Sequence, residues 1–181
     1  LERARELNQR LILRIDRAKD DLPLTMQKMV AEKQDKFTKA GKGHILYRFN
    51  NQRSDAWYKD DSVFTRETPK AKWALVSDSV LPNSTSKNYL EQTDLLVNYL
   101  KSTVFEGQPL PPEYQDAIAE FEKEKRGISG LMKDATWKQA ADKLSVLKIN
   151  QLLRHTPSEV AYDMIMVADN SNNRYLPDRW T

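Results

Sequence analysis

Cysteine is absent from the 181 residues, and histidine occurs only twice. Without a thiol, the chain can form no disulfide, thiolate nucleophile, or Cys-ligated zinc or iron–sulfur site. The two histidines, His44 and His155, are far apart in the sequence, and neither has acidic neighbours at the spacing of metal ligands. General-base catalysis by a histidine needs a positioned partner. We therefore expect both to cap helices or lie on the surface, and we expect no cofactor.

Long apolar runs and a large excess of one charge are also missing. No stretch approaches the roughly 20 apolar residues that a membrane span requires, and the charged start LERARELNQR does not resemble a signal peptide. The 29 basic and 26 acidic residues are interspersed and give a net charge of only +3, which does not indicate a nucleic-acid surface. Because the chain begins at Leu1 and stops at Thr181, we expect it to be part of a longer protein.

The first 43 residues have the spacing of two amphipathic helices. Leu22-Pro23 is typical of a stop and restart, and a second pattern runs from Met26 to Phe37 before Gly41-Lys42-Gly43 ends it. The sequence thus predicts a helical hairpin over residues 1–43, whose narrow stripe suits either packing within the chain or a homo-oligomer. The stripe consists of apolar residues three or four positions apart: Ala4, Leu7, Leu11, Ile15, Ala18 and Leu22.

The middle of the chain favours β-strands. Residues 44–49 alternate so that Ile45, Tyr47 and Phe49 share one face, and residues 73–77 form a second β-favouring run. Polar turns and short apolar pieces lie between these runs. We therefore expect a small antiparallel β section after the hairpin.

Helices are predicted on the C-terminal side of this β section. Asn88 and Glu91 fit a capping box at the start of one helix, and Gly107 with three nearby prolines separates it from the next. Glycine favours helix ends, so Gly127 and Gly130 are predicted to break the chain again.

Two more capping boxes mark the last helices. Residues 136–139 fit the first, with Trp137 facing inward, and residues 156–159 fit the second, with a proline at the first helical position. The predicted fold class is α+β and predominantly helical. Its predicted parts are the hairpin over residues 1–43 and an α+β domain over residues 44–181.

Several patterns resemble functional motifs but have plainer explanations. Residues 84–87 match the Ser-x-x-Lys pattern of penicillin-recognising enzymes, yet the accompanying Ser-Asp-Asn and Lys-Thr-Gly elements are absent from the sequence. Asn83 begins a glycosylation triplet, which arises often by chance. Asp60 and Asp61, near Asp55, lack the alternate spacing and glycine of a calcium loop. We expect turns at all of these positions.

Aromatic residues of the β section offer another candidate site. On a strand, alternating aromatics are more often core than a stacking platform for sugars or bases, so both roles stay open and the core is favoured. The residues concerned are Tyr47, Phe49, Trp57, Tyr58 and Trp73.

Three stretches together resemble a known group of proteins: residues 73–77, WALVS; residues 84–93, STSKNYLEQT; and residues 147–152, LKINQL, continued by TPSEVAYD at 156–163. The group comprises bacterial proteins, common in small-genome candidate phyla, that end in a hypervariable segment. They are similar to the variable proteins of diversity-generating retroelements, whose binding domain has a C-type-lectin-like fold. The resemblance covers residues 44–181 and implies that the ligand-contacting residues follow Thr181. No binding residue can therefore be assigned within this chain.

Three functional hypotheses follow. The leading one is a non-enzymatic ligand-display scaffold that binds an unidentified protein or cell-surface ligand through a segment after residue 181. The alternative is a helical structural or adaptor protein, such as a phage or envelope component, that assembles through its N-terminal helices. An enzyme is the third hypothesis, and the sequence offers no paired catalytic groups for it.

Overall fold

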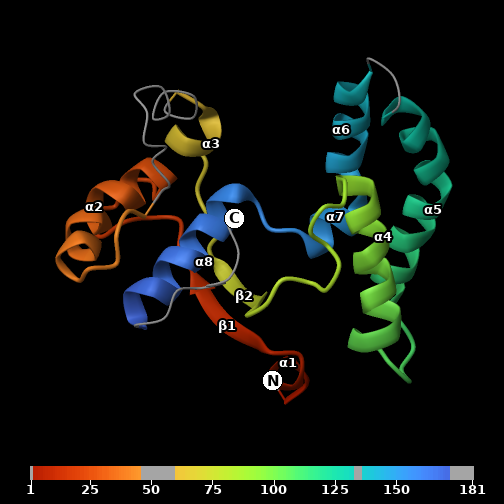
Figure 1. The fold of residues 1–181 in the computed structure, drawn as a ribbon, viewed down its shortest axis with the longest axis horizontal. Helices are drawn as coiled ribbons and strands as arrows, with labels where there is room; N and C mark the ends of the chain where they lie inside the picture. Colours follow the sequence, from red (N-terminus) through yellow and green to blue (C-terminus); the bar gives the residue numbers. More distant parts are fainter. Residues whose placement is uncertain (1, 46–59, 133–135, 172–181) are drawn as a thin grey trace. The chain divides into compact units, whose positions relative to one another are not determined.

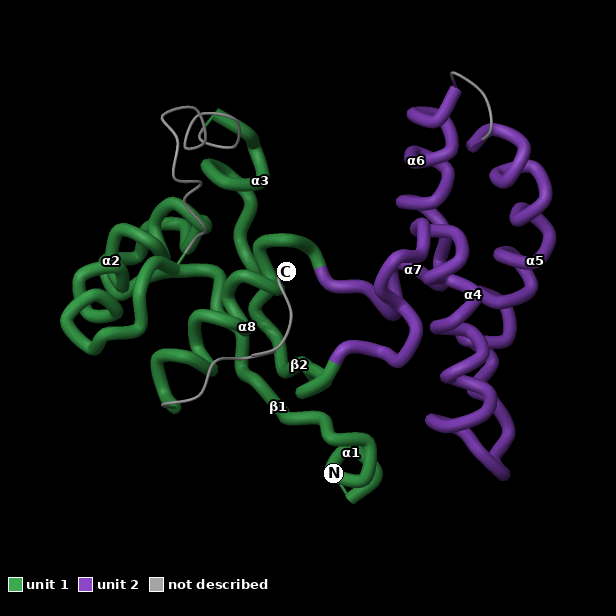
Figure 2. The backbone as a smooth tube through the Cα atoms, in the orientation of Figure 1, with its two compact units in different colours: residues 1–79, 156–181 green, residues 80–155 purple. Residues whose placement is uncertain are grey.

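The computed structural model describes residues 2–45, 60–132 and 136–171. The chain forms two compact units (Figure 2): unit 1 comprises residues 1–79 and 156–181, and unit 2 comprises residues 80–155. Unit 2 is mostly helical, and unit 1 combines helices with a two-stranded antiparallel sheet. The predicted fold class, α+β and predominantly helical, is confirmed. The predicted division after residue 43 does not coincide with these units, because both ends of the chain contribute to unit 1.

Unit 1 is built around a two-stranded sheet (Figure 1). The strands are antiparallel, with Gln9 opposite Ser77 and Arg14 opposite Lys72. The C-terminal helix α8 packs against β1, although the two are far apart in the sequence. The elements of unit 1 are α1 (Glu2–Glu6), β1 (Gln9–Arg14), α2 (Met26–Lys39), α3 (Ser62–Thr65), β2 (Lys72–Ser77) and α8 (Pro157–Asn170).

The prediction of one long helix in the first half of the hairpin is wrong. Helix α1 ends at Glu6, and Asn8 then adopts a left-handed backbone conformation with φ 51°. Asparagine tolerates this conformation better than most residues, so the chain can leave the helix and enter β1. The prediction failed because Leu11 and Ile15 are four positions apart, which fits the period of a helix and the alternation of a strand equally well.

The second helix of the hairpin is confirmed as α2, although it begins later than Pro23. Pro23 pairs with Arg17 in an isolated bridge of the preceding loop. Thr25 caps the helix, since its side chain accepts a hydrogen bond from the Lys28 backbone N–H at 3.1 Å. At the other end Gly41 has φ 69°, the left-handed conformation that ends a helix without a Cβ clash, as predicted.

Helices α2 and α8 are joined by apolar packing and by ion pairs. Asp169 of α8 is nearly buried and pairs with Lys33, at 2.7 Å, and with Lys36 of α2. Burial alone would raise the pKa of Asp169, but the two lysines outweigh it and hold the pKa below its ordinary value. The buried apolar residues of this part are Leu24, Met29, Phe37, Tyr162 and Ile165.

The predicted strands have different outcomes. Residues 73–77 are confirmed as part of β2, and their partner is β1. The predicted strand over residues 44–49 lies mostly outside the described residues, and His44 and Ile45 themselves are not in a strand.

Unit 2 is a group of packed helices. The capping box at Asn88 is confirmed: its side chain accepts from the Glu91 N–H at 2.9 Å, and the Glu91 carboxylate accepts from the Asn88 N–H at 2.9 Å. The elements are α4 (Tyr89–Tyr99), the π-helical turn η1 (Leu100–Val104), α5 (Pro112–Met132), α6 (Trp137–Val146) and α7 (Lys148–Leu153).

Three helix-end predictions in unit 2 are wrong. Gly127 and Gly130 do not break the chain, because both lie inside α5, which continues to Met132. Thr136 precedes α6 but does not cap it; its hydroxyl donates instead to the Leu131 carbonyl at 3.2 Å. Trp137 does not face inward, since it is 59% exposed.

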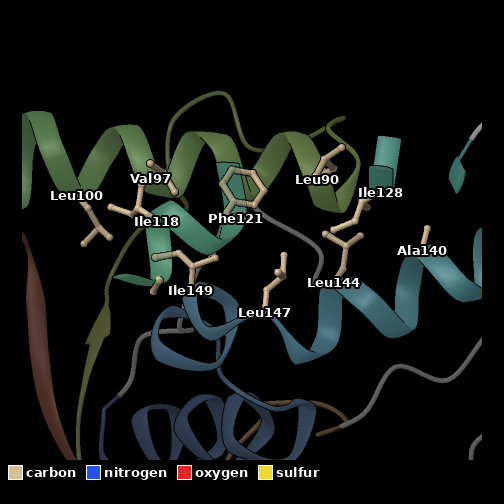
Figure 3. Close-up of a cluster of buried hydrophobic side chains, with 11 residues drawn as sticks. Leu90, Val97, Leu100, Ile118, Phe121, Ile128, Ala140, Leu144, Leu147 and Ile149 are labelled. Carbon is tan, nitrogen blue, oxygen red and sulfur yellow. The ribbon is translucent and has the colours of Figure 1, made fainter. Parts of the chain in front are cut away.

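Apolar side chains from all the helices of unit 2 meet in one core. Figure 3 shows Phe121 of α5 and Val97 of α4 on one side, with Ile149 of α7 and Leu144 of α6 opposite them. Phe121 and Ile149 are fully buried. Burying side chains of this size stabilises a fold by about 1.5–3 kcal/mol each.

Candidate functional site

The β1–β2 sheet has one covered face and one exposed face. Arg14, Ala74 and Val76 alternate onto the covered face, where all three are buried. The opposite face carries large apolar side chains that are between 44% and 63% exposed. We call this group the outer face; it consists of Leu11, Leu13, Trp73 and Leu75 of the strands, together with Ile15, which directly follows β1.

The register of the strands makes the outer face continuous. Leu11 lies opposite Leu75, and Leu13 lies opposite Trp73. The Asp78 N–H donates to the carbonyl oxygen of residue 8 at 2.9 Å, so residues 8 and 78 form a hydrogen-bonded pair. Such pairs alternate along an antiparallel ladder, and the two apolar pairs therefore occupy non-hydrogen-bonded sites, where side chains approach closest. The result is one contiguous apolar surface and not scattered exposed residues.

The covered face holds a cluster of buried charges. Arg14 is fully buried at the end of β1, and its Nε and Nη2 donate to Asp163 Oδ1 and Oδ2 at 2.9 and 2.5 Å. Its Nη1 lies 3.1 Å from Glu159 Oε1. Glu159 and Asp163 are four residues apart on α8 and so point the same way. Both carboxylates thus converge on one guanidinium.

This cluster is balanced in charge. Lys72, the cross-strand neighbour of Arg14, places its Nζ 3.7 Å from Glu159 Oε1, so two cations accompany two carboxylates. Burial alone would lower the pKa of Arg14, but the bonds to Asp163 and Glu159 outweigh it and raise the pKa. Tyr162 adds a hydrogen bond from its hydroxyl to the Leu13 carbonyl at 3.0 Å. The arrangement fixes α8 to β1.

Unit 2 also holds an internally paired arginine, Arg154, which is partly buried. Its guanidinium stacks on the Tyr89 ring with 3.8 Å between Cζ and the ring centroid. It donates to Asn150 Oδ1 at 3.0 Å, Gln92 Oε1 at 3.2 Å and Thr93 Oγ1 at 3.3 Å. Burial lowers the pKa of Arg154. Since these acceptors come from both α4 and α7, Arg154 joins the two helices.

The structure does not assemble the motif-like residues into a site. His44 and His155 are both exposed, as expected, and belong to different units. Residues 84–87 form a turn that ends before α4 begins, so Ser84 is not at a buried helix start. Asn83 lies in the preceding turn, which the Ser84 N–H closes by donating to the Leu81 carbonyl at 3.1 Å, and has φ 61°. Residues 84–87 therefore lack the helix-start position that the chemistry of penicillin-recognising enzymes requires.

Some of the acidic and aromatic candidates lie within the described residues, and others do not. Asp61 caps α3 by accepting from the Val63 N–H at 2.9 Å, and Asp60 is exposed beside it, whereas Asp55 lies outside the described residues. Of the proposed aromatic platform, Trp73 is in the outer face. The other four members lie outside the described residues: Tyr47, Phe49, Trp57 and Tyr58.

The described residues contain neither a metal-binding cluster nor a helix suited to span a membrane. Within residues 2–45, 60–132 and 136–171, no group of three or more His, Asp or Glu residues is placed to hold a metal ion. No helix in this part of the chain has both the length and the apolar character needed to cross a membrane.

The fold and the site together define an α+β protein with one buried charge cluster and one exposed apolar sheet face. Comparisons with protein-family models, curated proteins and solved structures find no match to this chain.

Neither feature of the sheet was expected from the sequence. Residues 1–22 were expected to be helical, although the alternation of Arg10, Ile12 and Arg14 with three apolar residues also fits a strand. The carboxylates of α8 were visible as a pair four residues apart, but nothing local connects them to a residue 149 positions earlier.

Proposed function

We propose that the chain is a non-enzymatic binding protein, in which unit 1 is a rigid frame for ligand-contacting residues located after Thr181. The observation that carries this proposal is the buried pairing of Arg14 with Glu159 and Asp163. It holds α8, the last described helix, to the sheet at two points one helical turn apart. Because α8 is fixed by folding, the cost of ordering it is not added when a ligand binds.

The pairing of polar groups inside the protein supports a non-enzymatic function. The buried guanidinium of Arg14 and the partly buried guanidinium of Arg154 bond to acceptors within the protein, and Asp169 pairs with two lysines. The shifted pKa values of these groups arise from burial and from those internal bonds. An active site needs such groups to be directed at a substrate. In the described residues they serve to join helices and strands.

The alternative, an adaptor that assembles through N-terminal helices, has less support. It required a helical stripe through Leu11 and Ile15, and this part of the chain is a strand and its continuation. The apolar residues Leu11 and Ile15 belong instead to the outer face.

Reading the coding DNA beyond Thr181 tests the display function. We expect the reading frame to continue into a further segment, with a near-identical template repeat and a reverse-transcriptase gene nearby. The DNA that encodes residues 80–155 is an internal control, because a framework unit should have no template repeat. A stop codon directly after Thr181, with no such neighbours, would contradict the proposal.

A further inference from the structure

We propose that the outer face of the β1–β2 sheet is a self-association surface, which pairs with the outer face of a second copy of this chain. The inference is independent of the display function, because it uses the side of the sheet that α8 does not cover. It also differs from the predicted helical seam, since two of its five residues, Trp73 and Leu75, come from β2.

The outer face is large enough to be an interaction surface. Five large side chains are each about half exposed, and at about 200 Å² per large side chain they present roughly 500 Å² of mostly apolar surface. Contiguous apolar patches of that size on a folded chain are commonly interaction sites. Trp73, at 63%, is the most exposed member and lies beside Leu13 across the strands.

The strands carry no charged residue on the outer face, which favours a copy of the chain over an anionic lipid surface as the partner. The strand residues that share the outer face are uncharged: Gln9, Leu11 and Leu13 on β1, and Trp73, Leu75 and Ser77 on β2. Two copies can therefore meet without burying like charges. A face without cations provides little net attraction for anionic headgroups.

The buried area sets the strength of the association. Two outer faces packed together would bury about 1,000 Å², which is at the low end for a specific protein interface. The expected complex is a reversible dimer with a dissociation constant on the order of micromolar. The association should be visible as a change of mass with concentration and not as a permanent oligomer.

Sedimentation equilibrium of the intact chain tests the inference. Over a concentration series through the micromolar range, the apparent mass should rise from 21.0 kDa toward twice that value. Trp73→Ser should keep the mass at the monomer value. Trp137→Ser is the matched control, because Trp137 is also exposed, at 59%, but lies in unit 2; it should associate like the unchanged chain.

A charge-pair experiment separates loss of association from loss of folding. Leu75→Glu and Leu75→Lys should each be monomeric alone, because like charges would face one another, and mixing the two should restore the dimer. Their far-ultraviolet circular dichroism should match that of the unchanged chain. A monomer at every concentration, or an oligomer that Trp73→Ser leaves intact, would overturn the inference. So would a chain that stays monomeric but binds vesicles containing phosphatidylserine through Leu75.

Discussion

A fully buried arginine is unusual, because removing a charge from water is costly unless partners replace the solvent. Arg14 meets this requirement with two carboxylates from α8, one of which it binds through two nitrogen atoms. The planar guanidinium suits this fork geometry, which a lysine cannot reproduce. Arg14 thus specifies the position of α8 on the sheet as well as stabilising it.

Replacing Arg14 should be strongly destabilising. In Arg14→Met the carboxylates of Glu159 and Asp163 stay buried without their main partner, so the free energy of unfolding should fall by about 3–5 kcal/mol. Urea denaturation followed by circular dichroism measures the change. Arg10→Met is the matched control: Arg10 is on the same strand but its pair with Asp78 is partly exposed, and exposed pairs contribute about 0–1 kcal/mol. Similar losses in the two variants would show that the buried cluster has no special role.

At the scale of elements, two helices begin with the same sequence pattern and only one uses it. Thr156 has an extended backbone, with ψ 158°, and forms a complete capping box with Glu159. Thr136 has ψ 17°, so its side chain cannot reach the first turn of α6 and makes no capping bond. The pattern identifies where a helix starts, and the backbone conformation decides whether the cap forms.

The difference between the two threonines can be measured. Thr156→Ala should lower the free energy of unfolding by about 1 kcal/mol, because the α8 N-terminus loses a side-chain acceptor. Thr136→Ala removes no cap from α6 and should have a smaller effect. Thermal denaturation of both variants provides the comparison, and an equal or larger loss in Thr136→Ala would contradict the assignment of the caps.

The sequence predicted elements well where their signals are local. The caps at Asn88 and Thr156 and the glycine end at Gly41 all act within a few residues, and all are present. β1 was missed because a strand depends on its partner, and β2 lies about sixty residues along the chain. The outer face was missed for the same reason, since its continuity depends on the pairing of Leu11 with Leu75. The resemblance suggested a functional hypothesis but predicted no contact within the chain.

At the scale of the whole molecule, the connectivity of the two units matters. Unit 1 combines residues from both ends of the chain, whereas unit 2 is one continuous segment, residues 80–155. Each unit has its own apolar core: one contains Phe121, and the other contains Phe37. Separate cores are the physical basis for separate cooperative units, because each can open without exposing the other's apolar residues.

Native-state hydrogen exchange should reveal these units. Phe121→Ala removes a fully buried ring, which should cost unit 2 about 3–5 kcal/mol and speed exchange at amides of α4 and α5. Amides of β1 and α8 should change much less. Phe37→Ala is the matched variant in unit 1 and should give the reverse pattern. If each substitution accelerates exchange equally in both units, the chain unfolds as one cooperative body, and the two cores are parts of a single folding unit.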